Sequence, residues 1–164
     1  MKKLIALTLA LMMVFALCAC GETANNEPEE TDNGGNAQMV NPMVEATPEE
    51  LKSTIGAALV PPEGANDTMY FVIGGNLGEV QFKYGETNEK YSYRVQKTDA
   101  LQDISGVYLS DPITPEDLEN AYSLAKCDGE YCVALWYVDG YSYSVSCATD
   151  DHELIETMRS LLGG

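Results

Sequence analysis

Few residues of the chain have the type and spacing that catalysis or metal binding requires. His152 is the sole histidine of the sequence, and Glu156 follows it at a spacing that would place both on one helical face. A zinc site uses three or four protein ligands, so we interpret His152 as a solvated helix residue and expect no metal and no other cofactor. The sequence contains no P-loop, no Gly-x-Gly-x-x-Gly motif and no complete nucleophile elbow. Paired carboxylates remain an open catalytic chemistry, because residues 48–164 hold 20 acidic side chains.

Three cysteines in the second half of the chain, Cys127, Cys132 and Cys147, could form a disulfide or stay as thiols. A two-residue turn at Asp139-Gly140 would place Cys132 opposite Cys147, ~4.5–5.5 Å away, which makes them the candidate pair. Cys127 would lie diagonal to Cys132 across a turn at Asp128-Gly129, ~7–8 Å away, so we expect these two not to pair. The preferred alternative is three buried thiols that act as small apolar residues.

The first 20 residues have the pattern of an export signal. Lys2 and Lys3 precede an uncharged apolar run over residues 4–17, which has the length of a signal-peptide core and falls short of the ~20 residues of a membrane-spanning helix. The run ends in Leu17-Cys18-Ala19-Cys20, which resembles the lipobox of bacterial lipoproteins. The resemblance implies cleavage before Cys20 and a diacylglyceryl group on its sulfur. This lipid would anchor the protein at the extracytoplasmic face of the bacterial cell membrane. A secretory signal cut elsewhere, giving a free protein, is the alternative.

The charge of the chain excludes one class of partner. With 26 acidic and 9 basic residues, its net charge is −17, whereas a nucleic-acid binder needs a basic surface. Residues 20–47 hold six acids, several Asn, Gly and Pro, and no Lys, Arg or aromatic residue. Such a segment buries too little apolar surface to offset the entropy of ordering. We therefore expect residues 1–19 to be a signal peptide, residues 20–47 a disordered tether, and residues 48–164 a single globular domain.

Helix signals flank that domain. Thr47-Pro48-Glu49-Glu50 combines an N-cap, a proline at the first helical position and a capping-box glutamate, and residues 60–64 are expected to stop this helix. Thr114-Pro115 repeats the start signal, but the next turn follows so soon that we expect a single helical turn. The last helix is expected to begin within residues 149–153, with Asp150 and Glu153 at capping-box spacing, and to present an apolar stripe through residue 162.

The segments between these helices have strand patterns. Alternation of apolar and polar residues, bounded by Gly and Asn, predicts strands over residues 69–73, 77–84, 89–97, 121–127, 131–138 and 141–148, and a short strand over 106–109. Residues 98–103 are expected to form a helical turn. The register set by Asp139-Gly140 would place Trp136 opposite Tyr143 on the inward face. Most of the ten tyrosines are interpreted as half-buried sheet residues, with a sugar-stacking surface as the alternative.

The order of elements predicts an α+β fold: an antiparallel meander sheet of about six or seven strands, with an N-terminal and a C-terminal helix packed on it. Three segments of the domain are similar to small lipoproteins of Gram-positive gut bacteria. They are residues 60–65, residues 104–108, and residues 135–137 leading into 143–146. This resemblance supports the boundaries and the membrane location and implies no particular chemistry.

Two classes of function follow from the sequence. The absence of catalytic motifs favours a monomeric, membrane-anchored, non-catalytic binding or interaction module whose protein or small-molecule ligand the sequence does not identify. The alternative is a small extracytoplasmic hydrolase that uses carboxylates.

Overall fold

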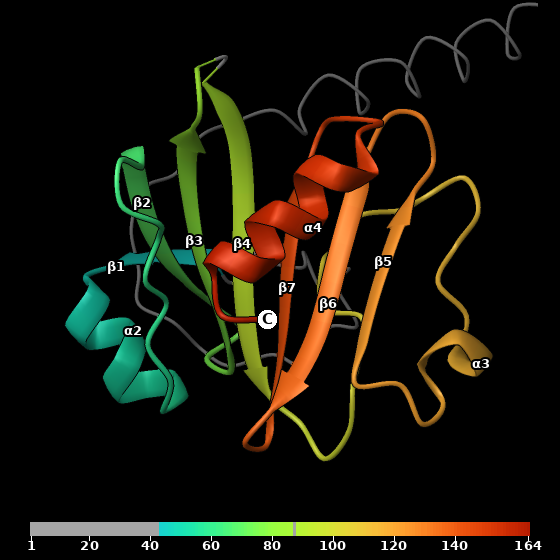
Figure 1. Cartoon of the computed structure of the whole chain (residues 1–164). Helices are drawn as coiled ribbons and strands as arrows, with labels where there is room; N and C mark the ends of the chain where they lie inside the picture. Colours follow the sequence, from blue (N-terminus) through green and yellow to red (C-terminus); the bar gives the residue numbers. More distant parts are fainter. Residues whose placement is uncertain (1–42, 87) are drawn as a thin grey trace, which may run out of the picture. The chain divides into compact units, whose positions relative to one another are not determined.

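A computed structural model describes residues 43–86 and 88–164 of the chain, in which an antiparallel sheet of seven strands carries helices at both ends of the sequence (Figure 1). The expected α+β fold is thereby confirmed. The expected signal peptide, Cys18, Cys20 and most of the expected tether lie outside the described residues. The elements are β1 (Met43–Ala46), α2 (Pro48–Ile55), β2 (Asn66–Ile73), β3 (Leu77–Tyr84), β4 (Glu89–Lys97), α3 (Pro115–Leu118), β5 (Ser123–Cys127), β6 (Cys132–Val138), β7 (Tyr141–Cys147) and α4 (His152–Leu161).

The strand order, β1-β2-β3-β4-β7-β6-β5, joins two groups of strands, β1–β4 and β5–β7, and within each group strands that follow one another in sequence are paired. Strand β4 pairs with β7, so the chain leaves β4, crosses the sheet and returns at its far edge as β5. The sheet thus departs from an uninterrupted meander at this one connection. Within the described residues, no helix is both long and apolar enough to span a membrane.

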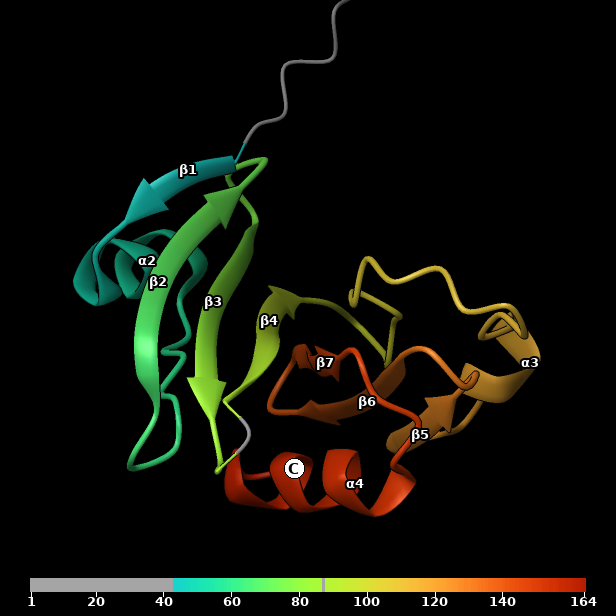
Figure 2. The same cartoon turned by 90° about the horizontal axis from the view of Figure 1, so that it is seen from above.

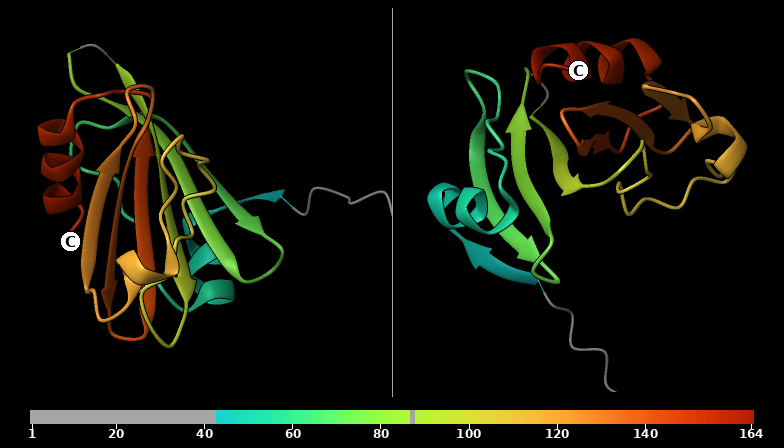
Figure 3. Two further views of the ribbon diagram at one scale, coloured as in Figure 1. Left: turned by 90° about the vertical axis from the view of Figure 1, so that its right-hand side faces the viewer. Right: turned by 90° about the horizontal axis from the view of Figure 1, so that it is seen from below.

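Helices α2 and α4 cover one face of the sheet and build the main core. Leu51 and Ile55 of α2 pack over β3 and β4, and Ile155 and Met158 of α4 pack over β5, β6 and β7. On the other side of β5–β7 lies the segment that contains α3, which Figure 2 and the right panel of Figure 3 show opposite α4. Leu101 and Leu109 are among its residues in a second, smaller core against β6.

The capping chemistry at Thr47 forms as the sequence predicts. The Thr47 hydroxyl accepts a hydrogen bond from the Glu50 amide, the Glu50 carboxylate accepts one from the Thr47 amide, and Pro48 is the first helical residue. The helix ends earlier than expected, at Ile55, because Gly56 adopts the left-handed conformation of a C-cap with φ of 88°. The turn α3 forms at Thr114 by the same chemistry. Helix α4 is capped by Asp151, one residue after the expected Asp150.

The predicted boundary between tether and domain is wrong. Residues 43–46, expected in the tether, form the edge strand β1, in which Met43 pairs with Ile73 and Ala46 with Tyr70. The folded domain therefore includes residues before 48. A strand this short owes its order to pairing with β2, which its own composition does not reveal.

The segment 98–114 forms neither the expected helical turn nor the expected strand. Hydrogen bonds from side chains, and not a ladder of backbone hydrogen bonds, fix its backbone. The Ser142 hydroxyl accepts from the Gln102 amide and donates to the Ala100 carbonyl, while the Asp103 carboxylate accepts from the Ser105 amide. These contacts fix the segment across the face of the sheet opposite the main core.

Candidate functional site

The sheet face opposite α2 and α4 is polar over β3, β4 and β7. Register places three cross-strand pairs in successive rows on β3 and β4: Glu79 with Arg94, Gln81 with Ser92, and Lys83 with Lys90. The segment 98–114 crosses this face but leaves an open cavity of about 340 Å³ beside it. We call this cavity the polar cleft; its lining includes Glu79, Gln81, Lys90, Ser92, Arg94, Ser105, Gly106, Val107, Tyr131 and Ser146.

A buried ion pair forms one wall of the polar cleft. Glu79 is 1% exposed, and its Oε2 accepts from Nε of Arg94 at 2.6 Å. Its Oε1 accepts from the Gln81 side-chain amide at 2.5 Å. Both oxygens of this carboxylate are therefore held, as a charge removed from water requires.

Arg94 also fixes the segment that crosses the sheet. Its Nη1 donates to the Ile104 carbonyl at 3.2 Å. A Cβ atom on Gly106 would lie 2.1 Å from the same nitrogen, and Gly106 has a φ of 67°, so glycine is the residue that allows the segment this close to the guanidinium. The shape of the polar cleft thus depends on Arg94.

Two serine hydroxyls on this face have no hydrogen-bond partner within the part of the chain that the structure describes. They are the buried Oγ atoms of Ser92 and Ser144. Buried hydroxyls are usually paired, and an unpaired one costs the fold free energy. Ser92 lines the polar cleft, so a molecule in the cleft could supply the missing partner.

The chemistry of the polar cleft suits binding better than hydrolysis. General acid–base cleavage of a glycosidic bond uses two carboxylates. Among the described residues that line the cleft, Glu79 is the sole carboxylate, and Arg94 and Gln81 already occupy it. The cleft instead presents converging donors and acceptors of the kind that orient a small ligand.

The aromatic residues of the opposite face form part of the core. Trp136, Tyr93 and Tyr143 form a cluster of three stacked rings. The ring centroid of Trp136 lies 5.8 Å from that of Tyr93 and 5.5 Å from that of Tyr143, and the two tyrosine centroids lie 6.2 Å apart. Trp136 and Tyr93 are each 4% exposed, so they do not form an open stacking platform. Burial raises the pKa of Tyr93 above its ordinary value and raises the pKa of Tyr91 to about 12. As predicted, these aromatic residues are buried or half-buried in the sheet: Tyr91, Tyr93, Trp136 and Tyr143.

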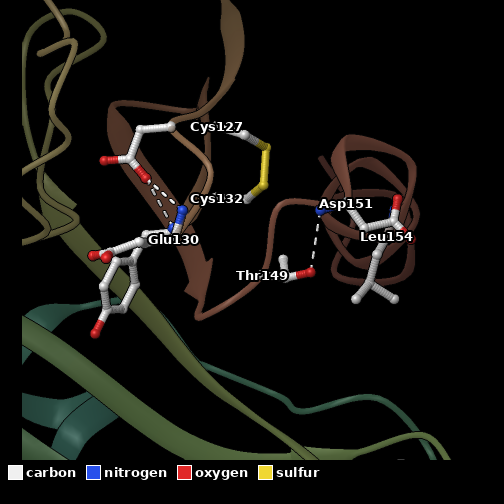
Figure 4. The surroundings of a disulfide bond; sticks show 8 residues. Cys127, Glu130, Cys132, Thr149, Asp151 and Leu154 are labelled. Carbon is white, nitrogen blue, oxygen red and sulfur yellow. Dashed lines mark hydrogen bonds between the residues drawn. A yellow bond between two sulfur atoms is a disulfide. The ribbon is translucent and has the colours of Figure 1, made fainter.

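The cysteines pair differently from the expectation. Cys127 is bonded to Cys132, with Cα atoms 4.1 Å apart (Figure 4), and Cys147 is a buried free thiol. Burial raises the pKa of the Cys147 thiol to about 12. The candidate pair Cys132–Cys147 is therefore wrong as a disulfide, although the two residues do lie opposite each other in the β6–β7 register.

The error lies in the turn at Asp128-Gly129. Its loop has four residues, because the Asp128 carboxylate accepts hydrogen bonds from the amides of Glu130 and Tyr131. Cys127 is therefore directly opposite Cys132. Asp128 also accepts from the Ser110 amide, and these three backbone donors, Ser110 first, lower the pKa of its carboxyl to about 2.

The remaining predicted site residues do not assemble a site. His152 is exposed at the start of α4, and Glu156 pairs with Arg159 at 2.7 Å. No group of three or more His, Cys, Asp or Glu side chains in the described ranges could hold a metal ion. The chain matches no profile of a known protein family, no curated protein and no solved structure.

Proposed function

We propose that the chain is a lipid-anchored, extracytoplasmic binding module of a bacterial cell membrane, with the polar cleft as its ligand site. The signal sequence and the lipobox residues support the anchor. The buried hydroxyl of Ser92, which has no partner among the described residues and lies beside the Glu79–Arg94 pair, is the observation that carries the choice of site. A carboxylate-dependent hydrolase is the weaker alternative, because a second carboxylate is missing from the described lining of the cleft.

The anchor is tested at Cys20. Expressed in a bacterium with its own signal, the protein is expected to enter the detergent phase and to incorporate labelled fatty acid. Cys20→Ser should lose the label, because a hydroxyl does not replace the thiolate that accepts the lipid. Cys18→Ser is the matched control and should keep the label, because position 18 requires only a small residue. Continued labelling of the Cys20→Ser protein would remove the anchor from the proposal.

The site is tested first through stability. Ser92→Ala is expected to leave the free energy of unfolding unchanged or to raise it by up to ~1 kcal/mol, because it removes a hydroxyl that has no partner. The matched control is Ser142→Ala, since Ser142 contacts Thr98, Ala100 and Gln102 through its hydroxyl. That change should cost about 1–3 kcal/mol. Both are measured by urea denaturation of the full chain in detergent. A loss above ~1 kcal/mol for Ser92→Ala would mean that the fold itself uses this hydroxyl.

A further inference from the structure

The polar cleft carries an excess of positive charge in a strongly acidic protein. Residues 43–164 hold seven Lys and Arg side chains. Three of them, Lys83, Lys90 and Arg94, lie on the same face of β3 and β4. Lys83 and Lys90 are direct cross-strand partners, and like charges in that position destabilise a sheet.

Acidic residues neutralise two of these three cations. Arg94 pairs with Glu79, and Lys83 pairs with Asp67 at 2.8 Å. Asp67 reaches Lys83 from an irregular stretch of β2, where its φ is 49°. None of the ion pairs among the described residues includes Lys90. One cation at the polar cleft is therefore left without an acidic partner.

Lys90 lies where two cavities meet. The polar cleft and a second cavity of about 440 Å³ share Gln81 and Lys90 in their linings. Each has the size of a small-molecule site. A ligand in either cavity would therefore contact Lys90.

The other groups of the cleft restrict the chemistry of that ligand. Ser92 is two residues from Lys90 on the same face of β4, on the order of 7 Å along the strand. Its buried hydroxyl has no hydrogen-bond partner in residues 43–86 and 88–164. Tyr131, which is 42% exposed, adds an aromatic ring to the lining. Lys90 can bind a carboxylate, the Ser92 hydroxyl can hydrogen-bond a ligand hydroxyl, and the Tyr131 ring can pack against the C–H face of a sugar.

We infer that the polar cleft binds a sugar acid, a hydroxylated ring compound with a carboxylate, which Lys90 holds while Ser92 hydrogen-bonds a ring hydroxyl. This inference rests on the proposed function and specifies its ligand class. Because the rest of the domain is negatively charged, it does not attract an anion. Lys90 is therefore the residue that makes the polar cleft prefer an acid over its neutral analogue.

The test compares D-glucuronate with D-glucose by titration of the full chain in detergent, followed by amide shifts in nitrogen-15 spectra. Glucuronate is expected to bind about tenfold or more tightly than glucose, with shifts at Gln81, Lys90 and Ser92 and weaker binding at higher salt. Lys90→Gln should remove this preference. Lys97→Gln is the matched control and should keep it, because Lys97 is exposed on the same strand but faces the other side of the sheet.

Each of the other outcomes of this titration overturns a defined part of the inference. Equal binding of glucose and glucuronate, weakened by Ser92→Ala, keeps the polar cleft as a ligand site and removes the role of charge. Glucuronate binding that survives Lys90→Gln places the carboxylate elsewhere and overturns the inference. Absence of saturable shifts with glucuronate also overturns it, whereas the proposed module is decided separately by lipid labelling and by the Ser92→Ala stability.

Discussion

Trp136→Ala is expected to lower the free energy of unfolding by about 3–5 kcal/mol, the range for removal of a large buried aromatic side chain. Trp136 is 4% exposed and stacks against the rings of Tyr93 and Tyr143. The change removes both stacking contacts and leaves a cavity beside the two tyrosine rings. Because Trp136 is the only tryptophan of the sequence, unfolding must be followed by circular dichroism in urea.

Two control variants make this result interpretable. Trp136→Phe keeps an aromatic ring in the stack and should cost less than the alanine variant. Tyr108→Ala removes a side chain that is 98% exposed and should change stability by less than ~0.5 kcal/mol. A loss below ~1 kcal/mol for Trp136→Ala would mean that the side chain lies at the surface, and it would restore the alternative of an aromatic binding platform.

Arg94→Met is also expected to lower the free energy of unfolding by about 3–5 kcal/mol, because it leaves the charge of Glu79 buried without its partner. Glu79 is 1% exposed, and its other contact, from Gln81, supplies a neutral donor. The Glu79→Met/Arg94→Met double variant should recover much of the loss, since no unpaired charge remains. Chemical denaturation of both single variants and the double variant gives the coupling free energy.

The matched control is the pair of Arg159 with Glu156 on α4, whose side chains are 23% and 34% exposed. Arg159→Met should cost at most ~1 kcal/mol, because solvent screens an ion pair at the surface. If Arg94→Met cost no more than Arg159→Met, the Glu79–Arg94 pair would not be the element that fixes this wall of the polar cleft.

Local chemistry made much of the fold predictable. The Thr47 and Thr114 capping boxes depend on residues three positions apart, and both form. The Asp139-Gly140 turn has positive φ at both residues, as a two-residue turn of this type needs. That turn sets the β6–β7 register, so Trp136 lies opposite Tyr143 as predicted.

Predictions failed where distant groups decide the local structure. Strand β1 is ordered by β2, and the segment 98–114 is held in part by the Ser142 hydroxyl from β7. The Asp128 side chain turns an expected two-residue loop into a four-residue loop, which brings Cys127 to Cys132. A dipeptide preference cannot weigh such a side-chain contact against the turn it would otherwise form.

The polar cleft was missed although part of it could have been found. Pairing Tyr84 with Glu89 across the β3–β4 loop also pairs Glu79 with Arg94 and Lys83 with Lys90. Opposite charges across a hairpin, and not paired carboxylates, are the sequence signal for this part of the site. The burial of Ser92 and the closeness of Gly106 to Arg94 depend on the path of the long crossing segment, which no local pattern specifies.

The junction between β4 and β7 also has a kinetic consequence. Its paired residues, from Lys97 with Tyr141 to Tyr91 with Cys147, lie 44 to 56 positions apart along the chain. The pairs β2–β3, β3–β4, β5–β6 and β6–β7 are hairpins, which close short loops quickly, and the paired residues of β1 and β2 lie 24 to 30 positions apart. Closing a long loop before its contacts form costs chain entropy, and folding slows as such non-local contacts increase. We therefore expect the hairpins of β2–β4 and of β5–β7 to form early, and the formation of the β4–β7 junction to limit the folding rate of the domain.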